Sequence, residues 1–213
     1  MHMRPTAEEW AAALIERHSR PVYEKLRAAR VAIAGLGGLG SNIAVALTRA
    51  GVGELLLVDF DRVDISNLNR QQYEAADIGR YKTDALREKL LRITPHVCIR
   101  TQTTRVDADN AAQIFRGYGI VCEAFDKAET KAMLINTLLT RLPECVLVAG
   151  SGMAGTLSAN SIVTRRAFDR LYLCGDGVTD VAEAGALMAP RVAVCANHQA
   201  HAALRLLLGE TDV

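Results

Sequence analysis

Three glycines and a carboxylate in the first third of the chain have the spacing of a nucleotide-binding site. Gly35, Gly37 and Gly40 follow the apolar run 31–34, which suits a buried strand, and they open a segment with helical periodicity. Such a turn brings backbone N–H groups and the positive end of a helix dipole to a phosphate. Asp59 stands about 20 residues further on, where a strand-end carboxylate accepts hydrogen bonds from ribose hydroxyls. The pattern predicts a nucleotide site, and NAD-dependent oxidoreductases share it.

A polar segment after the second predicted strand places two cations near the same phosphates. The run SNLNRQ contains Asn67, Arg70 and Gln71, and the run GRYK leads into the next predicted helix with Lys82. These residues lie beyond the strand ends, in the crevice where open α/β sheets bind ligands. Arg70 can hold phosphate oxygens through two N–H groups, and Lys82 supplies a point charge. Isolated cations are usually solvated surface charges, but the position of this pair favours phosphate binding.

The elements that must position these residues alternate between helices and strands up to residue 150. Strands are predicted at 31–34, 55–58, 97–102, 119–123 and 145–149, and helices at 6–29, 41–50, 82–93, 108–115 and 128–142. This alternation predicts an α/β, Rossmann-like fold with a doubly wound, mostly parallel sheet. Pro21 is expected to break or restart the first helix. The irregular stretch 59–81 is long for a compact domain and is therefore expected to be functional.

The pattern changes in the last third of the chain. Antiparallel strands at 156–164 and 171–174, a mobile glycine-containing loop at 175–189 and a final helix at 190–208 are predicted there. No linker-like stretch divides the sequence, so we expect one domain over residues 1–213. Its expected parts are a helical region (6–29), a nucleotide-binding core (30–150) and a C-terminal region of strands, loop and helix (151–209).

Composition limits the classes of partner. The chain has 25 basic and 24 acidic residues, and a formal net charge of +1 argues against a binder of nucleic acid or of membrane surfaces. No apolar stretch is long enough to span a bilayer, and the first ten residues lack the apolar core of a signal peptide. The five cysteines form no C-x-x-C pair, so neither zinc nor a redox dithiol is expected. Buried free thiols in a reducing cytoplasm explain them most simply.

The glycine turn and the polar segment together resemble the ThiF/MoeB/HesA family, the bacterial relatives of ubiquitin-activating enzymes. The resemblance is carried by GLGGLG at 35–40, GVG at 51–53, DFD at 59–61, SNL at 66–68, RQ at 70–71 and Lys82. The family binds ATP rather than NAD and adenylates the C-terminal glycine of a small ubiquitin-fold sulfur carrier. The short chain without zinc motifs is most similar to the compact ThiF branch, which implies a carrier of thiamine thiazole synthesis.

The resemblance also assigns roles to individual residues. It implies an ATP site made of Gly35, Gly37, Gly38, Gly40, Asp59, Asp61, Ser66, Asn67, Arg70, Gln71 and Lys82. Within this set, Gly38 lies against the phosphates, Asp59 against the ribose, and the cations Arg70 and Lys82 act in catalysis. A family aspartate that holds Mg²⁺ matches Asp126, although Lys127 stands where the family often has asparagine. An ordinary helix cap is the alternative role for Asp126.

Two further positions are open at this stage. Glu123 can be a second metal ligand or a solvent-facing strand end. The family completes its site with an arginine from the partner subunit of a dimer, and Arg17 or Arg20 in the helical region is the candidate.

Cys174 and the pair His198 and His201 receive no role, because an apolar neighbourhood disfavours a thiolate and paired helix histidines are usually packing or surface residues.

The implied reaction is nucleotidyl transfer. The carrier's terminal carboxylate is already ionised at neutral pH, so the site needs alignment and charge neutralisation but no general base. A molybdopterin-type or other carrier is an alternative substrate, and a carboxylate on tRNA is disfavoured by the balanced charge. An NAD-dependent oxidoreductase and a non-catalytic scaffold that binds nucleotide or carrier are the alternatives from other classes.

Overall fold

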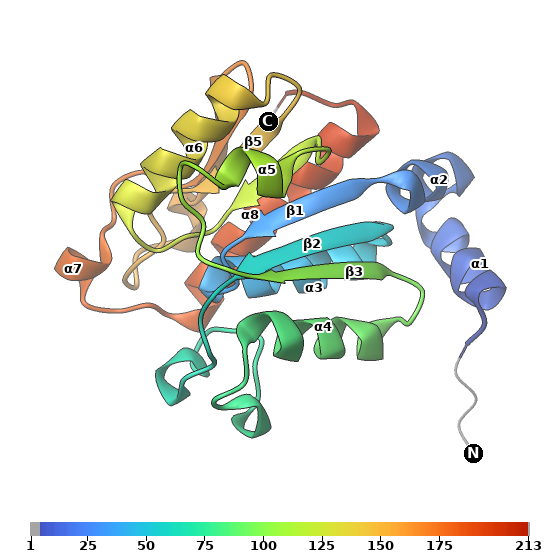
Figure 1. Ribbon diagram of the computed structural model, residues 1–213, viewed down its shortest axis with the longest axis horizontal. Helices are drawn as coiled ribbons and strands as arrows, with labels where there is room; N and C mark the ends of the chain where they lie inside the picture. The colour runs from blue at the N-terminus through green and yellow to red at the C-terminus, as the bar shows by residue number, and fades with distance from the viewer. Residues whose placement is uncertain (1–4, 213) are drawn as a thin grey trace.

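A seven-stranded sheet forms the centre of the molecule (Figure 1). The computed structural model describes residues 5–212 of the 213-residue chain. The strands are β1 (Arg30–Ala34), β2 (Glu54–Asp59), β3 (Cys98–Thr103), β4 (Ile120–Glu123), β5 (Val146–Gly150), β6 (Val163–Phe168) and β7 (Leu171–Gly175). Their order is β3-β2-β1-β4-β5-β7-β6, and only the pairing of β6 with β7 is antiparallel. The predicted Rossmann-like, mostly parallel α/β sheet is therefore confirmed.

Helices cover both faces of the sheet (Figure 1). One face packs against α3 (Gly38–Ala50), α4 (Lys82–Ile93) and α8 (Ala189–Leu208), and the other against α5 (Ala111–Phe115) and α6 (Ala128–Arg141). Because both faces are covered, the central strands β1, β2, β4 and β5 are almost wholly buried and read as apolar runs. Each parallel strand is followed by a loop at the same edge, and these loops carry the predicted site residues.

The N-terminal region forms two helices rather than one. The helices are α1 (Ala7–His18) and α2 (Arg20–Ala28). Thr6 caps α1 in a capping box, as expected, and the break falls at Ser19, whose φ is 76°. Pro21 lies in the first turn of α2, where its missing N–H costs nothing. Both helices lie at the edge of the sheet where β1 begins, on the right of Figure 1.

The C-terminal region differs in part from the prediction. Residues 156–162 form a loop with the 3₁₀ turn η3 (Ala159–Ser161) instead of a strand, because side chains hold the backbone groups that a ladder would need. The strand β7 pairs in parallel with β5, so β6 alone carries the antiparallel direction. The stretch 175–189, expected as a loop, contains the short helix α7 (Val181–Ala184). Within residues 5–212 no helix has the length and apolarity that crossing a bilayer requires.

Candidate functional site

A cavity of about 440 Å³ opens at the edge of the sheet where β1, β2 and β4 end. Ten of the predicted residues line it: Gly35, Gly37, Gly38, Asp59, Asp61, Asn67, Arg70, Gln71, Lys82 and Asp126. The structure thus brings together residues from five separate stretches of sequence. Gly40, Ser66 and Arg17 are not among the lining residues.

Close packing requires glycine at two positions of the glycine turn. Gly35 has a φ of 90°, and a Cβ there would lie 2.8 Å from the carbonyl oxygen of Ala124. A Cβ on Gly40 would collide with the carbonyl oxygen of Gly35. Gly40 therefore acts in the packing of α3 against the turn, behind the cavity. A Cβ on Gly37 would find its nearest neighbour at 3.7 Å, an ordinary contact, so Gly37 leaves open space toward the cavity.

Asp59 is held rigidly at the end of β2. Its carboxylate accepts the N–H of Leu36 at 2.6 Å and the N–H of Asp61 at 2.8 Å, and the residue is 8% exposed. Burial raises the pKa of Asp59, and the positive charge of Lys82 opposes that shift. The carboxylate links the glycine turn to the polar segment and still borders the cavity.

Lys82 is the better fixed of the two predicted cations. It is the first residue of α4 and is 6% exposed, and its Nζ lies 3.2 Å from Oδ2 of Asp61. A positive charge at a helix N-terminus is unfavourable, and the carboxylate of Asp61 offsets that repulsion. The Asp61 side chain is 50% exposed, so the pair faces the solvent-filled side of the site.

Arg70 is held by the polar segment itself. Its Nη1 donates to the carbonyl of Ser66 at 3.1 Å and to Oδ1 of Asn69 at 2.7 Å. Asn42 of α3 donates to the carbonyls of Gly38 at 2.7 Å and of Arg70 at 3.2 Å, which fastens the segment onto the glycine turn. Asn42 was missed at the sequence level, because an asparagine within a helical pattern gives no sign of a distant partner.

Two neighbours of Arg70 differ in their fit to a ligand. Gln71 is 9% exposed, and among residues 5–212 its buried Oε1 has no hydrogen-bond partner. An unpaired buried acceptor beside a cavity is where a bound donor or water is expected. Ser66 is exposed and its hydroxyl donates to Asp64 at 2.7 Å, so its side chain is used in the turn.

Asp126 presents an uncommitted carboxylate. It is exposed, lines the cavity, and pairs with no side chain in the described part of the chain. The N-cap of α6 is Lys127, and no side chain caps that helix, so the helix-cap alternative for Asp126 is wrong. No cluster of three or more potential metal ligands exists within residues 5–212. One carboxylate fits Mg²⁺ that takes its other ligands from phosphates and water.

Glu123 is neither a solvent-facing strand end nor a free ligand. It has no exposed surface, and its carboxylate pairs with Nζ of Lys131 at 2.9 Å. Burial raises the pKa of Glu123, and Lys131 acts in the opposite direction. Since its oxygens are occupied, Glu123 does not fit the role of a second metal ligand.

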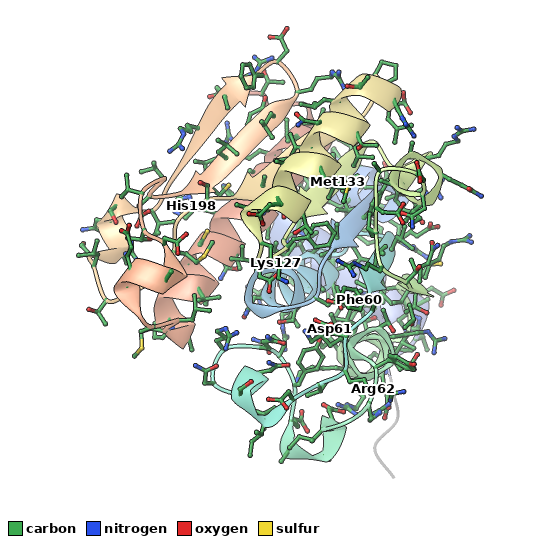
Figure 2. The ribbon with its side chains drawn as sticks, turned by 60° about the vertical axis from the view of Figure 1, so that its left-hand side comes forward. Phe60, Asp61, Arg62, Lys127, Met133 and His198 are labelled. Carbon is green, nitrogen blue, oxygen red and sulfur yellow. The ribbon has the colours of Figure 1, made fainter. Side chains whose placement is uncertain are left out.

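Several lining residues were not predicted. They are Phe60, Thr104, Arg105, Val106, Lys127, Thr130 and Lys131, besides apolar neighbours. Figure 2 shows Lys127 where α6 begins, on the side of the helix end toward Phe60 and Asp61. Residues 104–106 follow β3 directly, so the rule that strand ends share one edge would have found them. Among the described lining residues, five side chains are cationic and three are carboxylates, which favours an anionic ligand.

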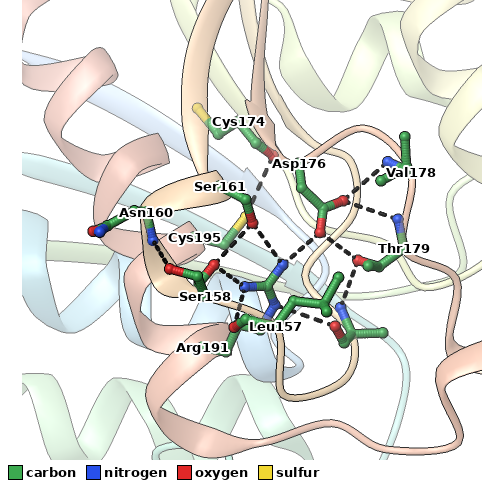
Figure 3. A network of polar contacts seen from close by, with 11 residues as sticks. Leu157, Ser158, Asn160, Ser161, Cys174, Asp176, Val178, Thr179, Arg191 and Cys195 are labelled. Atoms are coloured by element: carbon green, nitrogen blue, oxygen red, sulfur yellow. Dashed lines mark hydrogen bonds and ion pairs between the residues drawn. The ribbon is translucent and has the colours of Figure 1, made fainter.

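A buried arginine fastens the C-terminal loops beside the cavity (Figure 3). Arg191, in the first turn of α8 and 4% exposed, donates to the carbonyls of Ala154, Leu157 and Ser158 and pairs with Asp176. Asp176 in turn accepts the N–H groups of residues 178 and 179. The loops on both sides of β6 and β7 are thereby joined, and the segment 175–189 is anchored at its start.

The remaining sequence candidates lie apart from the cavity. Cys174 is fully buried, and burial raises the pKa of its thiol to about 11, which agrees with an inert thiol. His198 shares a hydrogen bond of 2.9 Å with Thr164 and serves packing. Cys98 is exposed, contrary to the expectation of buried thiols. Arg17 is exposed on α1, at the opposite edge of the sheet in the same chain (Figure 1).

Comparison with known proteins agrees with this geometry. The ThiF family model matches residues 11–213. Molybdopterin-synthase adenylyltransferase of Salmonella typhimurium is 34% identical over 190 residues, which are 86% of this chain and 75% of that protein. The tRNA threonylcarbamoyladenosine dehydratase of Haemophilus influenzae is 33% identical over 130 residues, 60% of this chain and 50% of that protein.

A solved structure supports the fold. The E. coli tRNA N6-threonylcarbamoyladenosine dehydratase in complex with AMP superimposes with a TM-score of 0.86 over 98% of each chain, at 21% sequence identity. That identity supports likeness of fold alone, whereas the family match spans nearly the whole chain. The chain therefore belongs to the ThiF family, as a nucleotidyltransferase of the ThiF/MoeB type.

Proposed function

We propose that this protein uses ATP to adenylate the C-terminal glycine carboxylate of a ubiquitin-fold sulfur carrier. The observation that carries the proposal is the lining of one cavity by Arg70, Lys82 and Asp126 together with the glycine turn. Two cations and one free carboxylate suit a triphosphate and its metal, and they suit a dinucleotide cofactor poorly. An arrangement for hydride transfer would need a proton relay, for which the lining offers no histidine among the described residues.

In the proposed reaction the carrier's carboxylate oxygen attacks the α-phosphorus of ATP, and the bond to the β-phosphate oxygen breaks. Pyrophosphate leaves with that electron pair, and the carrier keeps AMP as an acyl-adenylate. Arg70 and Lys82 neutralise charge on the phosphates, Asp59 orients the ribose, and Gln71 offers its free acceptor. Because the nucleophile arrives ionised, no side chain has to remove a proton.

We also propose that Asp126 holds Mg²⁺ together with the phosphates. When bound, the metal supplies additional positive charge to the phosphate oxygens. Lys127, where the family often has asparagine, places a further cation beside this carboxylate. Lys127 thus departs from the common family pattern, whereas the acidic residue Asp126 is retained.

Two candidates are proposed for the carrier. A carrier of thiamine thiazole synthesis is our first candidate, since the chain has no C-x-x-C pair. The molybdopterin carrier is supported by the sequence match to the Salmonella typhimurium adenylyltransferase. The segment 175–189 is anchored at its start by the pair of Asp176 with Arg191, and it contributes Leu187 to the cavity wall. We propose that it holds an extended carrier tail.

The proposed working unit is a homodimer of a single adenylating domain spanning residues 1–213. Its site would be completed by Arg17 of the second copy, because helix α1, which carries Arg17, lies where β1 begins, at the opposite edge of the sheet from the cavity (Figure 1). Mixing Arg17→Ala with Lys82→Ala chains tests this: complementation would restore part of the activity if arginine acts between copies. Failure of the mixture to exceed the single variants would remove Arg17 from the site.

The test of function is carrier-dependent exchange of pyrophosphate into ATP, measured with a panel of ubiquitin-fold proteins that end in Gly-Gly. We expect exchange with one carrier, none without a carrier, and none when that carrier's last glycine is deleted. NAD binding without exchange would favour an oxidoreductase. ATP binding without exchange for any carrier would favour a scaffold.

A second candidate is the reaction of the Haemophilus influenzae relative, which is named for dehydration of threonylcarbamoyladenosine in tRNA. The sequence match over 130 residues favours it specifically. The formal net charge of +1 provides no general attraction for RNA, which places this candidate second. ATP turnover that depends on tRNA and ignores every carrier would reverse the order.

A further inference from the structure

A buried ion pair beneath the cavity joins β4, β5 and α6. Glu123 is the last residue of β4 and has no exposed surface. Lys131 of α6 brings its Nζ to 3.2 Å from Oε1 and 2.9 Å from Oε2 of Glu123, and to 3.1 Å from the carbonyl oxygen of Gly150 at the end of β5. The three contacts of the ammonium group are all with protein oxygens, and the Lys131 side chain, 21% exposed, also borders the cavity.

A side chain from a second helix completes the arrangement. Gln199 of α8 is fully buried, and its Nε2 donates to the carbonyls of Glu123 at 2.9 Å and of Val148 at 3.0 Å. The amide thus bridges the end of β4 and the middle of β5 from the other face of the sheet. We call Glu123, Lys131 and Gln199 the strand-end clamp.

The clamp controls the turn that carries Asp126. Oε1 of Glu123 accepts the N–H of Phe125 at 2.7 Å, which leaves Asp126 one residue beyond a fixed point. The turn that carries Asp126 also packs against the glycine turn, since a Cβ on Gly35 would lie 2.8 Å from the Ala124 carbonyl oxygen and 3.0 Å from Phe125. One buried carboxylate therefore fixes both the free acidic residue and the floor of the glycine turn.

We propose that the strand-end clamp positions Asp126 relative to the glycine turn, and so sets how strongly Mg²⁺ enhances ATP binding. This inference rests on the proposed function. Its residues act through Asp126, so they are positioning residues. Lys131 borders the cavity, but its ammonium group is held by Glu123 and by the carbonyl of Gly150. The charge of Lys131 serves the clamp, because an uncompensated buried carboxylate would draw water or a proton and release the turn.

The test compares the dissociation constants of ATP in Mg²⁺ and in EDTA by isothermal titration calorimetry. The dissociation constant in EDTA divided by the dissociation constant in Mg²⁺ measures how strongly Mg²⁺ enhances ATP binding. This ratio is independent of any carrier. Lys131→Met should lower the ratio about 10-fold, as loss of an outer-shell partner does at metal sites. Lys131→Arg keeps the charge and should retain most of the enhancement.

A second variant separates positioning from folding. Glu123→Leu with Lys131→Met removes both charges and fills similar volume, so the fold should persist while Phe125 loses its acceptor. Glu54→Gln is the matched control: this carboxylate, 3.1 Å from Arg30 and 3.0 Å from Arg100, lies at the opposite ends of the strands and should leave the ratio unchanged. Circular dichroism verifies folding of each variant.

The two outcomes that oppose the clamp can be told apart. If the folded double variant keeps the wild-type ratio, the clamp has no positioning role and the inference is overturned, while the proposed function stands. If the wild-type protein binds no ATP in either buffer, the proposed function is overturned and the clamp with it.

Discussion

At the residue scale, Lys82 and Arg70 carry the proposed charge neutralisation in different ways. Lys82 is buried and paired with Asp61, whereas Arg70 is partly exposed and bonded to its own segment. Loss of either should lower carrier-dependent exchange about 10²- to 10³-fold, the usual effect of removing one electrostatic contact to a transition state. Initial rates of exchange for Arg70→Ala and Lys82→Ala measure this.

Lys89→Ala is the matched control for these substitutions. Lys89 also pairs with a carboxylate, Glu74 at 3.0 Å, and it does not line the cavity. Its exchange rate should equal that of the wild type. Near-normal exchange by Arg70→Ala or Lys82→Ala would remove these cations from the reaction.

The pKa of Asp59 gives a second prediction at this scale. Burial raises that pKa, so on acidification Asp59 takes up a proton at a higher pH than an ordinary aspartate, whose pKa is about 3.9. Its protonated form accepts more weakly from ribose hydroxyls. The affinity advantage of ATP over 2′,3′-dideoxy-ATP should therefore shrink as the pH falls, before ordinary aspartates titrate.

Calorimetric titration of both nucleotides from neutral to mildly acidic pH measures this advantage. The two ligands carry the same phosphates, so ionisation of the nucleotide cancels in the comparison. An advantage that stays constant down to the ordinary range would separate Asp59 from the ribose.

At the scale of elements, the glycine turn depends on the contact between its first and last glycine. A Cβ on Gly40 would collide with the Gly35 carbonyl, so Gly40→Ala should push α3 away from β1 and destabilise the protein by about 1–3 kcal/mol. Gly119→Ala is the control, because a Cβ there meets nothing within 4 Å. Urea unfolding of both variants gives the free energies, and equal stabilities would show that the turn relaxes freely.

The loops after β5 and β7 depend on Asp176 and Arg191. Burial acts to raise the pKa of Asp176, but the backbone N–H groups of Thr179 and Val178, the Thr179 hydroxyl and Arg191 together lower it to about 2. Because this folded-state pKa lies below the unfolded value of about 3.9, the contribution is present above pH 4 and is lost as the pH falls toward 2.

Asp176→Asn should therefore destabilise the protein at pH 7 and less so as the pH approaches 2. Urea unfolding at a series of pH values follows the difference from the wild type. Removal of one partner from a buried pair typically costs about 3–5 kcal/mol, which sets the scale at neutral pH. A difference independent of pH would show that the carboxylate charge is not what holds the loops.

At the scale of the whole molecule, the strands could be predicted because a covered parallel sheet needs continuous apolar runs. The ends of those strands then located Asp59 and the two cations Arg70 and Lys82, and the family resemblance supplied Asp126. The strand-end clamp could not be predicted this way, since Lys131 and Gln199 read as ordinary helix residues. Lys131 lies only 8 residues from Glu123, but Gln199 lies 76 residues from Glu123 and 51 from Val148, so the three residues meet only once the sheet has formed.

The C-terminal loops show the same limit. The run 156–164 has strand-like composition, yet Arg191 takes up carbonyl groups of Leu157 and Ser158, so the strand begins only at Val163. That competition depends on a side chain more than 30 positions away. Local pattern alone carries no information about it.

The central claim is that a carrier's carboxylate attacks the α-phosphorus of ATP, and an isotope transfer tests it most directly. A carrier whose terminal carboxylate holds ¹⁸O in both oxygens is incubated with ATP and the protein, and hydroxylamine then captures the acyl group. The account predicts AMP that contains one ¹⁸O, because a carboxylate oxygen becomes part of the phosphate. The other ¹⁸O stays with the carrier as the carbonyl oxygen of the hydroxamate. Release of unlabelled AMP, with both ¹⁸O atoms retained by the carrier, would contradict the account.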